Sequence, residues 1–121
     1  MSLITLGITD LARAQTFYEA LGWRALPQSN ASVVFFQCGG IVFALFGREA
    51  LAEDANLAPY GEGFSGIALA HNVRGKDDVD AVLAEAEAAG GKILKRGQEA
   101  VWGGFTGYFS DPDGHVWEVA W

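Results

Sequence analysis

The chain has 121 residues, 50% of them hydrophobic and only 19% charged, so its composition is that of one folded domain and excludes a disordered segment. Eight Lys and Arg residues against fifteen Asp and Glu residues give a net charge of −7. This charge argues against nucleic acid and against an anionic membrane surface as partners, because both attract basic proteins.

The sequence gives no sign of export, membrane insertion or a disulfide framework. Cys38 is the single cysteine. The first residues lack the basic and long apolar regions of a signal peptide, and no apolar run approaches the ~20 residues of a membrane span. We therefore expect a cytoplasmic protein.

The first half of the chain predicts one strand, one helix and three further strands. A strand over residues 2–6 precedes a helix over 11–21, in which apolar residues recur at helical spacing. Three strands follow, at residues 23–26, 32–38 and 41–46. Gly39 and Gly40 form a two-residue hairpin loop between the last two of them.

The second half repeats this order. Residues 2–6 align with 65–69, and residues 41–45 align with 115–119. A strand, a helix and three strands are predicted at residues 65–69, 77–89, 92–95, 101–110 and 115–121. The turn over 111–114 is typical of a hairpin with a bulge. We expect repeats over about residues 1–46 and 65–121, joined by a linker over 47–64 with a short helix at 48–53.

This repeated βαβββ unit resembles the vicinal oxygen chelate superfamily, which includes glyoxalase I, extradiol dioxygenases and bleomycin-binding proteins. The residues that carry the resemblance are Ile8-Thr9-Asp10-Leu11, Phe17-Tyr18 with Leu21-Gly22, and Phe109-Ser110-Asp111-Pro112-Asp113-Gly114-His115 followed by Glu118. The resemblance implies an α+β fold, in which the two repeats form one curled mixed β-sheet with helices on its convex face. It also implies one domain over residues 1–121 and a homodimer, with Trp121 as a candidate contact.

Members of that superfamily commonly hold a metal with four side chains on the concave face of the sheet. The resemblance places Leu3, Ala44, Gly66 and Glu118 at those positions. Three of these residues have no side-chain lone pair to donate, and one carboxylate alone does not make a tight divalent site. We therefore expect no metal and no other cofactor, and we expect neither metal-dependent glyoxalase I nor dioxygenase activity.

Strand alternation predicts which residues share the concave face with Glu118. The hairpin loop pairs Phe35 with Ala44, and the turn over 111–114 pairs Tyr108 with Glu118. The predicted ligand-binding residues are Thr5, Phe35, Gln37, Trp102, Thr106, Tyr108 and Glu118, with Trp102 included if Gly103 and Gly104 make no second bulge. Small residues are predicted to line the floor of the cleft and to leave it roomy: Gly7, Ala44, Gly66, Ala68 and Ala70. An apolar cleft with few polar groups is the usual form of a small-molecule site.

Each candidate has a structural alternative. Glu118 is the candidate general acid or base, or else a solvated carboxylate of the sheet. Tyr108 and Trp102 contact a ligand, or else only pack within the cleft. Of the two histidines, we expect a structural role for His71 and solvent exposure for His115.

Three functions remain open from the sequence. The first is a metal-independent member of the superfamily that binds a small, partly apolar or aromatic molecule, for which bleomycin-binding proteins are the precedent. The second is a glyoxalase- or lyase-type enzyme that uses Glu118 as a proton-transfer base. The third is a structural or regulatory dimer without a ligand.

Overall fold

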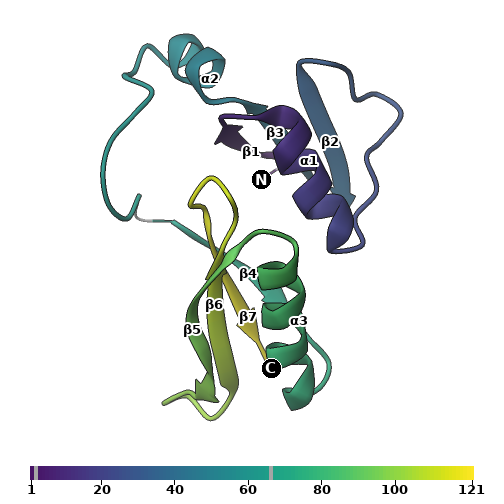
Figure 1. The fold of residues 1–121 in the computed structure, drawn as a ribbon, viewed down its shortest axis with the longest axis vertical. Helices are drawn as coiled ribbons and strands as arrows, with labels where there is room; N and C mark the ends of the chain where they lie inside the picture. Colours follow the sequence, from purple (N-terminus) through teal and green to yellow (C-terminus); the bar gives the residue numbers. More distant parts are fainter. Residues whose placement is uncertain (2, 66) are drawn as a thin grey trace. The chain divides into compact units, whose positions relative to one another are not determined.

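The computed structural model describes residues 1, 3–65 and 67–121, and the chain forms two compact units, residues 1–63 and 64–121 (Figure 1). Each unit has one mixed β-sheet and one long helix, in the order expected from the sequence. The predicted α+β class is therefore confirmed; the second unit has the expected strand, helix and three strands, whereas the first unit has two strands after its helix α1. No helix in the described part of the chain is long and apolar enough to cross a membrane.

The first unit contains a three-stranded sheet of order β1-β3-β2. Its elements are β1 (Leu3–Ile8), α1 (Leu11–Ala20), β2 (Val33–Cys38), β3 (Ile41–Gly47) and the short α2 (Arg48–Asp54). β1 runs parallel to β3, and β2 runs antiparallel to it. Helix α1 begins where the Asp10 carboxylate accepts the backbone N–H of Arg13 at 3.0 Å, and it ends before Gly22, whose φ of 95° suits glycine.

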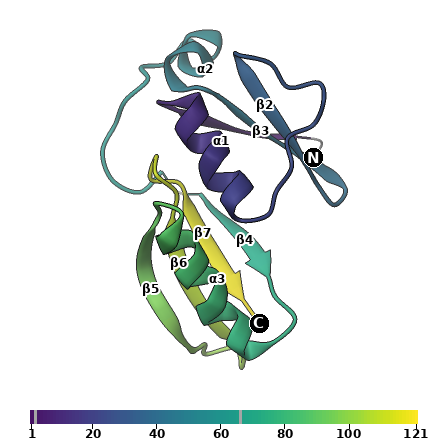
Figure 2. The same cartoon turned by 45° about the vertical axis from the view of Figure 1, so that its right-hand side comes forward.

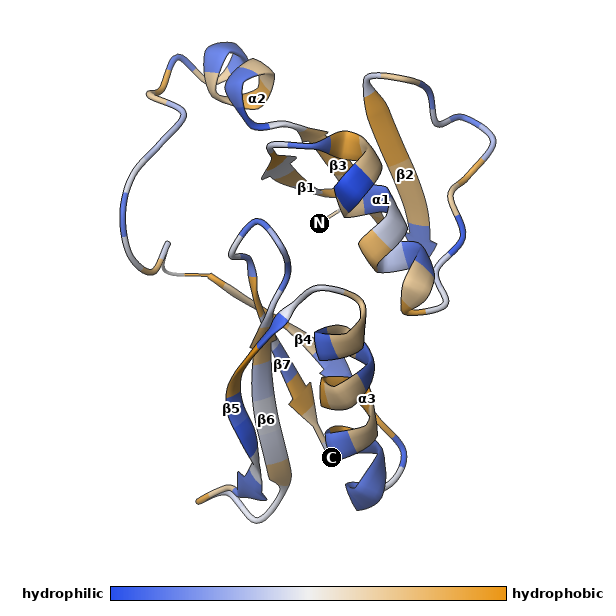
Figure 3. Cartoon of the chain, viewed as in Figure 1, coloured by the Kyte–Doolittle hydropathy of each residue, from blue (hydrophilic) through white to orange (hydrophobic). Residues whose placement is uncertain are grey.

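Helix α1 covers one face of this sheet, as Figure 2 shows. Tyr18 is fully buried there; its ring stacks on Trp23 at 5.0 Å and meets Phe43 edge-on at 5.2 Å. Strand β2 is largely apolar along its length (Figure 3), and its residues Val34 and Phe36 are buried. Since successive side chains of a strand point to opposite faces, Phe35 and Gln37 lie on the face that α1 does not cover.

The second unit contains a four-stranded sheet of order β4-β7-β6-β5. Its elements are β4 (Ala68–Asn72), α3 (Lys76–Ala88), β5 (Lys92–Glu99), β6 (Phe105–Ser110) and β7 (Val116–Ala120). β4 is parallel to β7, and the other pairs are antiparallel. The buried side of α3 packs on the sheet, where Phe109 and Trp117 stack at 6.2 Å with their rings nearly parallel.

Four predicted strands differ from the structure in their extent. In place of a strand over 23–26 there is a single bridge between Ala25 and Phe36, because Pro27 has no N–H to continue the ladder and the chain then turns. The strand expected over 101–110 begins only at Phe105. The residues before it form a turn, in which the Gly103 N–H donates to the Ala100 carbonyl at 3.0 Å. The strand expected over 92–95 continues to Glu99 as β5, with two register shifts in its pairing to β6, and the strand expected over 65–69 is β4, at Ala68–Asn72.

Candidate functional site

Glu118 lies on the face of the second unit's sheet that α3 does not cover, which we call the open face. Its neighbours on β7, Trp117 and Val119, are buried, and alternation therefore turns Glu118 to the opposite side. The ladder places Glu118 opposite Tyr108 on β6 and opposite Ala70 on β4. The pairing of Glu118 with Tyr108 is the one that the turn over 111–114 predicts.

The carboxylate of Glu118 has a hydrogen-bond partner on β6. The Thr106 hydroxyl donates to Glu118 Oε1 at 2.9 Å, and Thr106 is only 6% exposed. Thr106 is the diagonal neighbour of Glu118, two residues before Tyr108 along the strand, within reach of a long side chain. The Glu118 side chain is half-buried and leans from its own rung towards the start of β6.

Trp102 reaches the open face by a route that strand alternation does not describe. A Cβ on Gly107 would lie 2.6 Å from Leu83 Cδ1 of α3, so Gly107 faces the helix, whereas Thr106 and Gly104 face the open side. A Cβ on Gly104 would lie 1.9 Å from Trp102 Cζ3. The indole therefore folds back from the loop between β5 and β6 and lies over Gly104, with 62% of Trp102 exposed.

In the first unit, the corresponding uncovered face carries the other predicted residues. Thr5 lies opposite Ala44, and Ala44 lies opposite Phe35, so these three form one row across the sheet. Thr5 and Phe35 are half-buried, and Ala44 is buried. Gln37 has a structural contact, because its side-chain amide donates to the Gly39 carbonyl at 2.7 Å and closes the hairpin.

Only some of the small residues predicted for the floor of the cleft lie where they were expected. Ala68 and Ala70 are exposed on β4 beside Glu118, as expected. Gly7 is small for another reason: a Cβ there would lie 3.2 Å from the backbone of Arg48, so close packing of α2 accounts for the glycine. Gly66 lies outside the described residues.

The donor set does not fit the superfamily's metal. Leu3 and Ala44 have no donor atom in their side chains, and Gly66, which lies outside the described residues, has no side chain. Within residues 1, 3–65 and 67–121, no three His, Cys, Asp or Glu side chains gather in a way that could hold a metal ion. Glu118 is bonded to a hydroxyl on the neighbouring strand instead.

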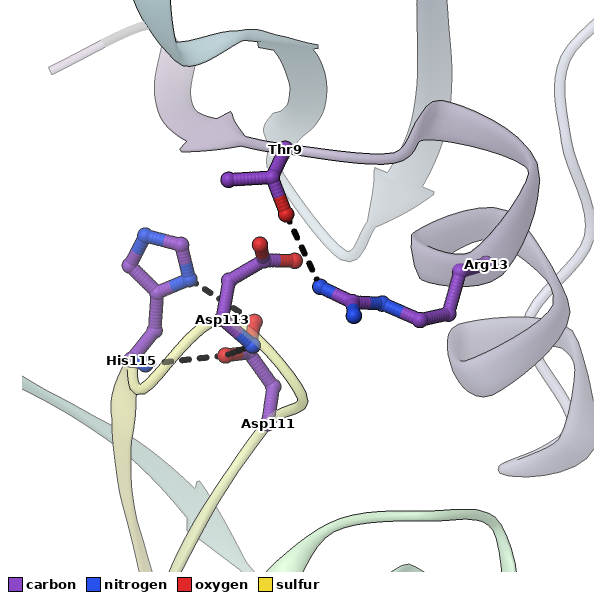
Figure 4. Close-up of polar contacts among 5 residues, drawn as sticks. All are labelled: Thr9, Arg13, Asp111, Asp113 and His115. Atoms are coloured by element: carbon purple, nitrogen blue, oxygen red, sulfur yellow. Dashed lines mark hydrogen bonds and ion pairs between the residues drawn. The ribbon is translucent and has the colours of Figure 1, made fainter.

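His115 is only partly exposed to solvent, less than the sequence predicts, and Asp111 is the residue that sequence reasoning missed. The Asp111 carboxylate is buried; its Oδ1 accepts the backbone N–H groups of Asp113 and His115 at 3.0 and 2.8 Å. Its Oδ2 lies 2.8 Å from His115 Nδ1, and the His115 side chain is only 18% exposed (Figure 4). An Asp whose side chain bonds the backbone two residues on is a known turn signal. This bonding fixes the turn that sets the register of Glu118.

Figure 4 also shows a contact at the start of the first helix. There the Arg13 guanidinium donates to the Thr9 hydroxyl at 2.9 Å. Both residues flank Asp10, the N-cap of α1. This contact, like the cap, ties the end of β1 to the first turn of the helix.

Comparison with known proteins gives one family and many structural relatives. The model of the Glyoxalase/Bleomycin resistance protein/Dioxygenase superfamily matches residues 1–119. No curated protein matches at a significant level. Among solved structures, the chain is similar to a glyoxalase-related enzyme from Fulvimarina pelagi, with 39% identity, a TM-score of 0.90, and coverage of 99% of this chain and 86% of that one.

Two more distant structures share the fold. A glyoxalase/bleomycin resistance protein/dioxygenase family enzyme from Burkholderia phytofirmans PsJN is 21% identical, with a TM-score of 0.85, over 98% of this chain and 95% of that one. A lactoylglutathione lyase from Agrobacterium tumefaciens is 24% identical, with a TM-score of 0.73, over 99% and 91%. At these identities the likeness is one of fold.

Proposed function

We propose a function from the premise that this chain belongs to the Glyoxalase/Bleomycin resistance protein/Dioxygenase superfamily and has its glyoxalase-like α+β fold. The proposal is that the protein, acting as a single domain over residues 1–121, binds a small, partly apolar or aromatic molecule without a metal. The observation that carries it is the surrounding of Glu118: a carboxylate beside Tyr108, Ala70 and Thr106 on an open sheet face, in a chain whose other metal positions lack donors.

The open face offers the two kinds of contact that such a ligand needs. Tyr108 and Trp102 supply aromatic surface, and Trp102 lies over Gly104 while remaining largely exposed. Glu118 supplies an acceptor for an N–H or O–H group. Ala68 and Ala70 are small and exposed, and thus leave room beside the carboxylate. Sparse polar groups on an apolar surface are typical of small-molecule sites.

In the first unit, Thr5 and Phe35 form a second proposed contact surface on the uncovered face of that sheet. Gln37 is the weaker member of the predicted set. Its side-chain amide donates a hydrogen bond to the Gly39 carbonyl within the hairpin.

A second candidate function is a lyase- or isomerase-like proton transfer with Glu118 as the base. The 39% identity to a glyoxalase-related enzyme favours it. In that reaction Glu118 takes a proton from the hydroxyl-bearing carbon next to a carbonyl group and returns it to the former carbonyl carbon, while the hydroxyl proton passes to the former carbonyl oxygen. The carboxylate would act without the Lewis acid that commonly stabilises the enediolate, and this lowers the expected rate.

The test is a titration with three compounds that share one ring: 2-phenylethylamine, 2-phenylethanol and 3-phenylpropionate. Amide spectra are recorded by NMR in a buffer with a metal chelator. We expect binding of the amine, with shifts along β6 and β7. We also expect affinity losses in Tyr108→Ala and Trp102→Ala of about 2- to 12-fold, from the ~0.5–1.5 kcal/mol of an aromatic pair. Val101→Ala, a fully exposed neighbour of Trp102, is the matched control.

Other outcomes separate the alternatives. Exchange of carbon-bound protons of dihydroxyacetone with D2O, lost in Glu118→Gln, would favour the enzyme. If no compound binds and no proton exchanges, the structural dimer without a ligand is favoured and the proposal fails.

A further inference from the structure

We propose that Thr106 is a positioning residue that directs the Glu118 carboxylate along the open face towards Trp102 and away from Tyr108. The sequence places Thr106 among the ligand contacts. Its hydrogen bond gives it a different task, because its proton is used by Glu118. The inference about orientation rests on geometry alone, and its consequence for ligand choice rests on the proposed function.

Burial requires a partner for the Thr106 hydroxyl. The residue is 6% exposed, and buried hydroxyl groups in proteins are almost always hydrogen-bonded. Its direct ladder partner on β7, Ala120, has no polar side chain. The diagonal neighbour, Glu118, supplies the acceptor at 2.9 Å. In the described part of the chain, Glu118 is the side-chain hydrogen-bond acceptor of the Thr106 hydroxyl.

The hydrogen bond from Thr106 sets the direction of the Glu118 carboxylate. Glu118 lies opposite Tyr108 in the ladder, and its hydrogen bond to Thr106 directs its carboxylate towards a position two residues earlier on β6. Gly104, covered by the Trp102 indole, lies two residues further in the same direction. Tyr108 remains the direct ladder partner of Glu118, while the carboxylate is hydrogen-bonded to Thr106.

The second oxygen of Glu118 is then the acceptor for a ligand. Within the described residues, Glu118 accepts one hydrogen bond, at Oε1, and we assign Oε2 to a donor group of the ligand. Thr106 lies between Tyr108 and Gly104 along β6, so the carboxylate that it holds is directed towards the strand end that the Trp102 indole covers. A planar ring on the indole would bring an attached ammonium or N–H group towards Oε2. We infer a preference for ligands with such a donor next to a ring, over ligands that carry a carboxylate.

A first experiment needs no ligand. Glutamate carboxyl carbons are labelled with ¹³C, and the Glu118 Cδ resonance is assigned through Glu118→Gln. Thr106→Val keeps the shape and removes the hydroxyl, and we expect the resonance to move. Thr106→Ser keeps the hydroxyl and should leave the resonance in place. Tyr108→Phe, the matched control on the direct ladder partner, should also leave it. Thr106→Ala serves if the valine variant does not fold.

A second experiment uses 2-phenylethylamine as the probe. We expect Thr106→Val to weaken its binding about 3- to 10-fold, as the loss of one net hydrogen bond would. Thr106→Ser should restore the affinity. In a Glu118→Gln background, Thr106→Val should add no further loss, because it acts through Glu118.

The two experiments keep the failures apart. A Glu118 resonance that moves in Tyr108→Phe and not in Thr106→Val overturns the positioning role, whatever the probe does. Equal further loss from Thr106→Val in the Glu118→Gln background would also overturn it, since Thr106 would then contact the ligand itself. If the wild-type protein does not bind the probe, the proposed function fails, while the carboxyl resonance still decides the role of Thr106.

Discussion

Replacing Gly104 with alanine should displace the Trp102 indole from the open face. A Cβ at this position would lie 1.9 Å from Trp102 Cζ3 and 2.1 Å from Cη2, whereas ordinary contacts begin at 3.4 Å. The ring must therefore withdraw by about 1.5 Å. The carbonyl of Trp121 at 2.6 Å must also yield, and overpacking of this kind costs about 1–3 kcal/mol of stability. The φ of Gly104 is outside the left-handed region, so the cost is steric.

The assay follows both the ring and the ligand. The Trp102 indole N–H resonance, assigned through Trp102→Phe, should shift in Gly104→Ala. The affinity for 2-phenylethylamine should fall about 2- to 12-fold, because a displaced ring no longer supplies the ~0.5–1.5 kcal/mol of an aromatic contact. Gly61→Ala is the control, since a Cβ there meets nothing within 4 Å. An unchanged indole resonance in Gly104→Ala would refute the placement of Trp102.

Three further predictions concern the rest of the chain. Asp111→Ala removes three hydrogen bonds from the turn before β7 and should lower the free energy of unfolding in urea by about 2–4 kcal/mol; a loss under 1 kcal/mol would contradict this role. Burial raises the pKa of the Cys38 thiol, so iodoacetamide should react more slowly with the folded protein than with the urea-unfolded one at pH 8. Equal rates of iodoacetamide reaction in the folded and unfolded protein would contradict the burial. The contribution of the protonated thiol to the free energy of unfolding should decline as the pH rises past the ordinary thiol pKa. We also expect a homodimer by light scattering, weakened by Trp121→Ala, a change at a half-exposed aromatic residue; a wild-type monomer at micromolar concentration would exclude it.

The strand pairings near the site could be predicted from the sequence because the turns fix them. Gly39 and Gly40 allow a two-residue loop, which leads to the observed pairing of Phe35 with Ala44. The turn over 111–114 leads in the same way to the pairing of Tyr108 with Glu118. In both hairpins a local rule is enough, because register follows directly from loop length.

The side-chain contacts of the site could not be predicted in this way. Alternation places Thr106 on the right face, but whether its hydroxyl serves a ligand or Glu118 depends on burial and on the diagonal neighbour. Trp102 belongs to a loop, where the alternation of side chains along a strand does not apply. Its indole can lie on the open face because Gly104 has no side chain. His115 was expected in solvent, because the sequence does not show that the Asp111 carboxylate turns inward to bond it.

The central claim is that this protein binds its ligand through Glu118 without a metal. Calorimetric titration of 2-phenylethylamine into the chelator-treated protein, with and without added zinc, tests it most directly, with Glu118→Gln as the comparison. We predict the same affinity with and without zinc in the wild-type protein, and weaker binding in Glu118→Gln. Binding that appears only when zinc is added, with one equivalent of zinc retained after dialysis and lost in Glu118→Gln, would contradict the account.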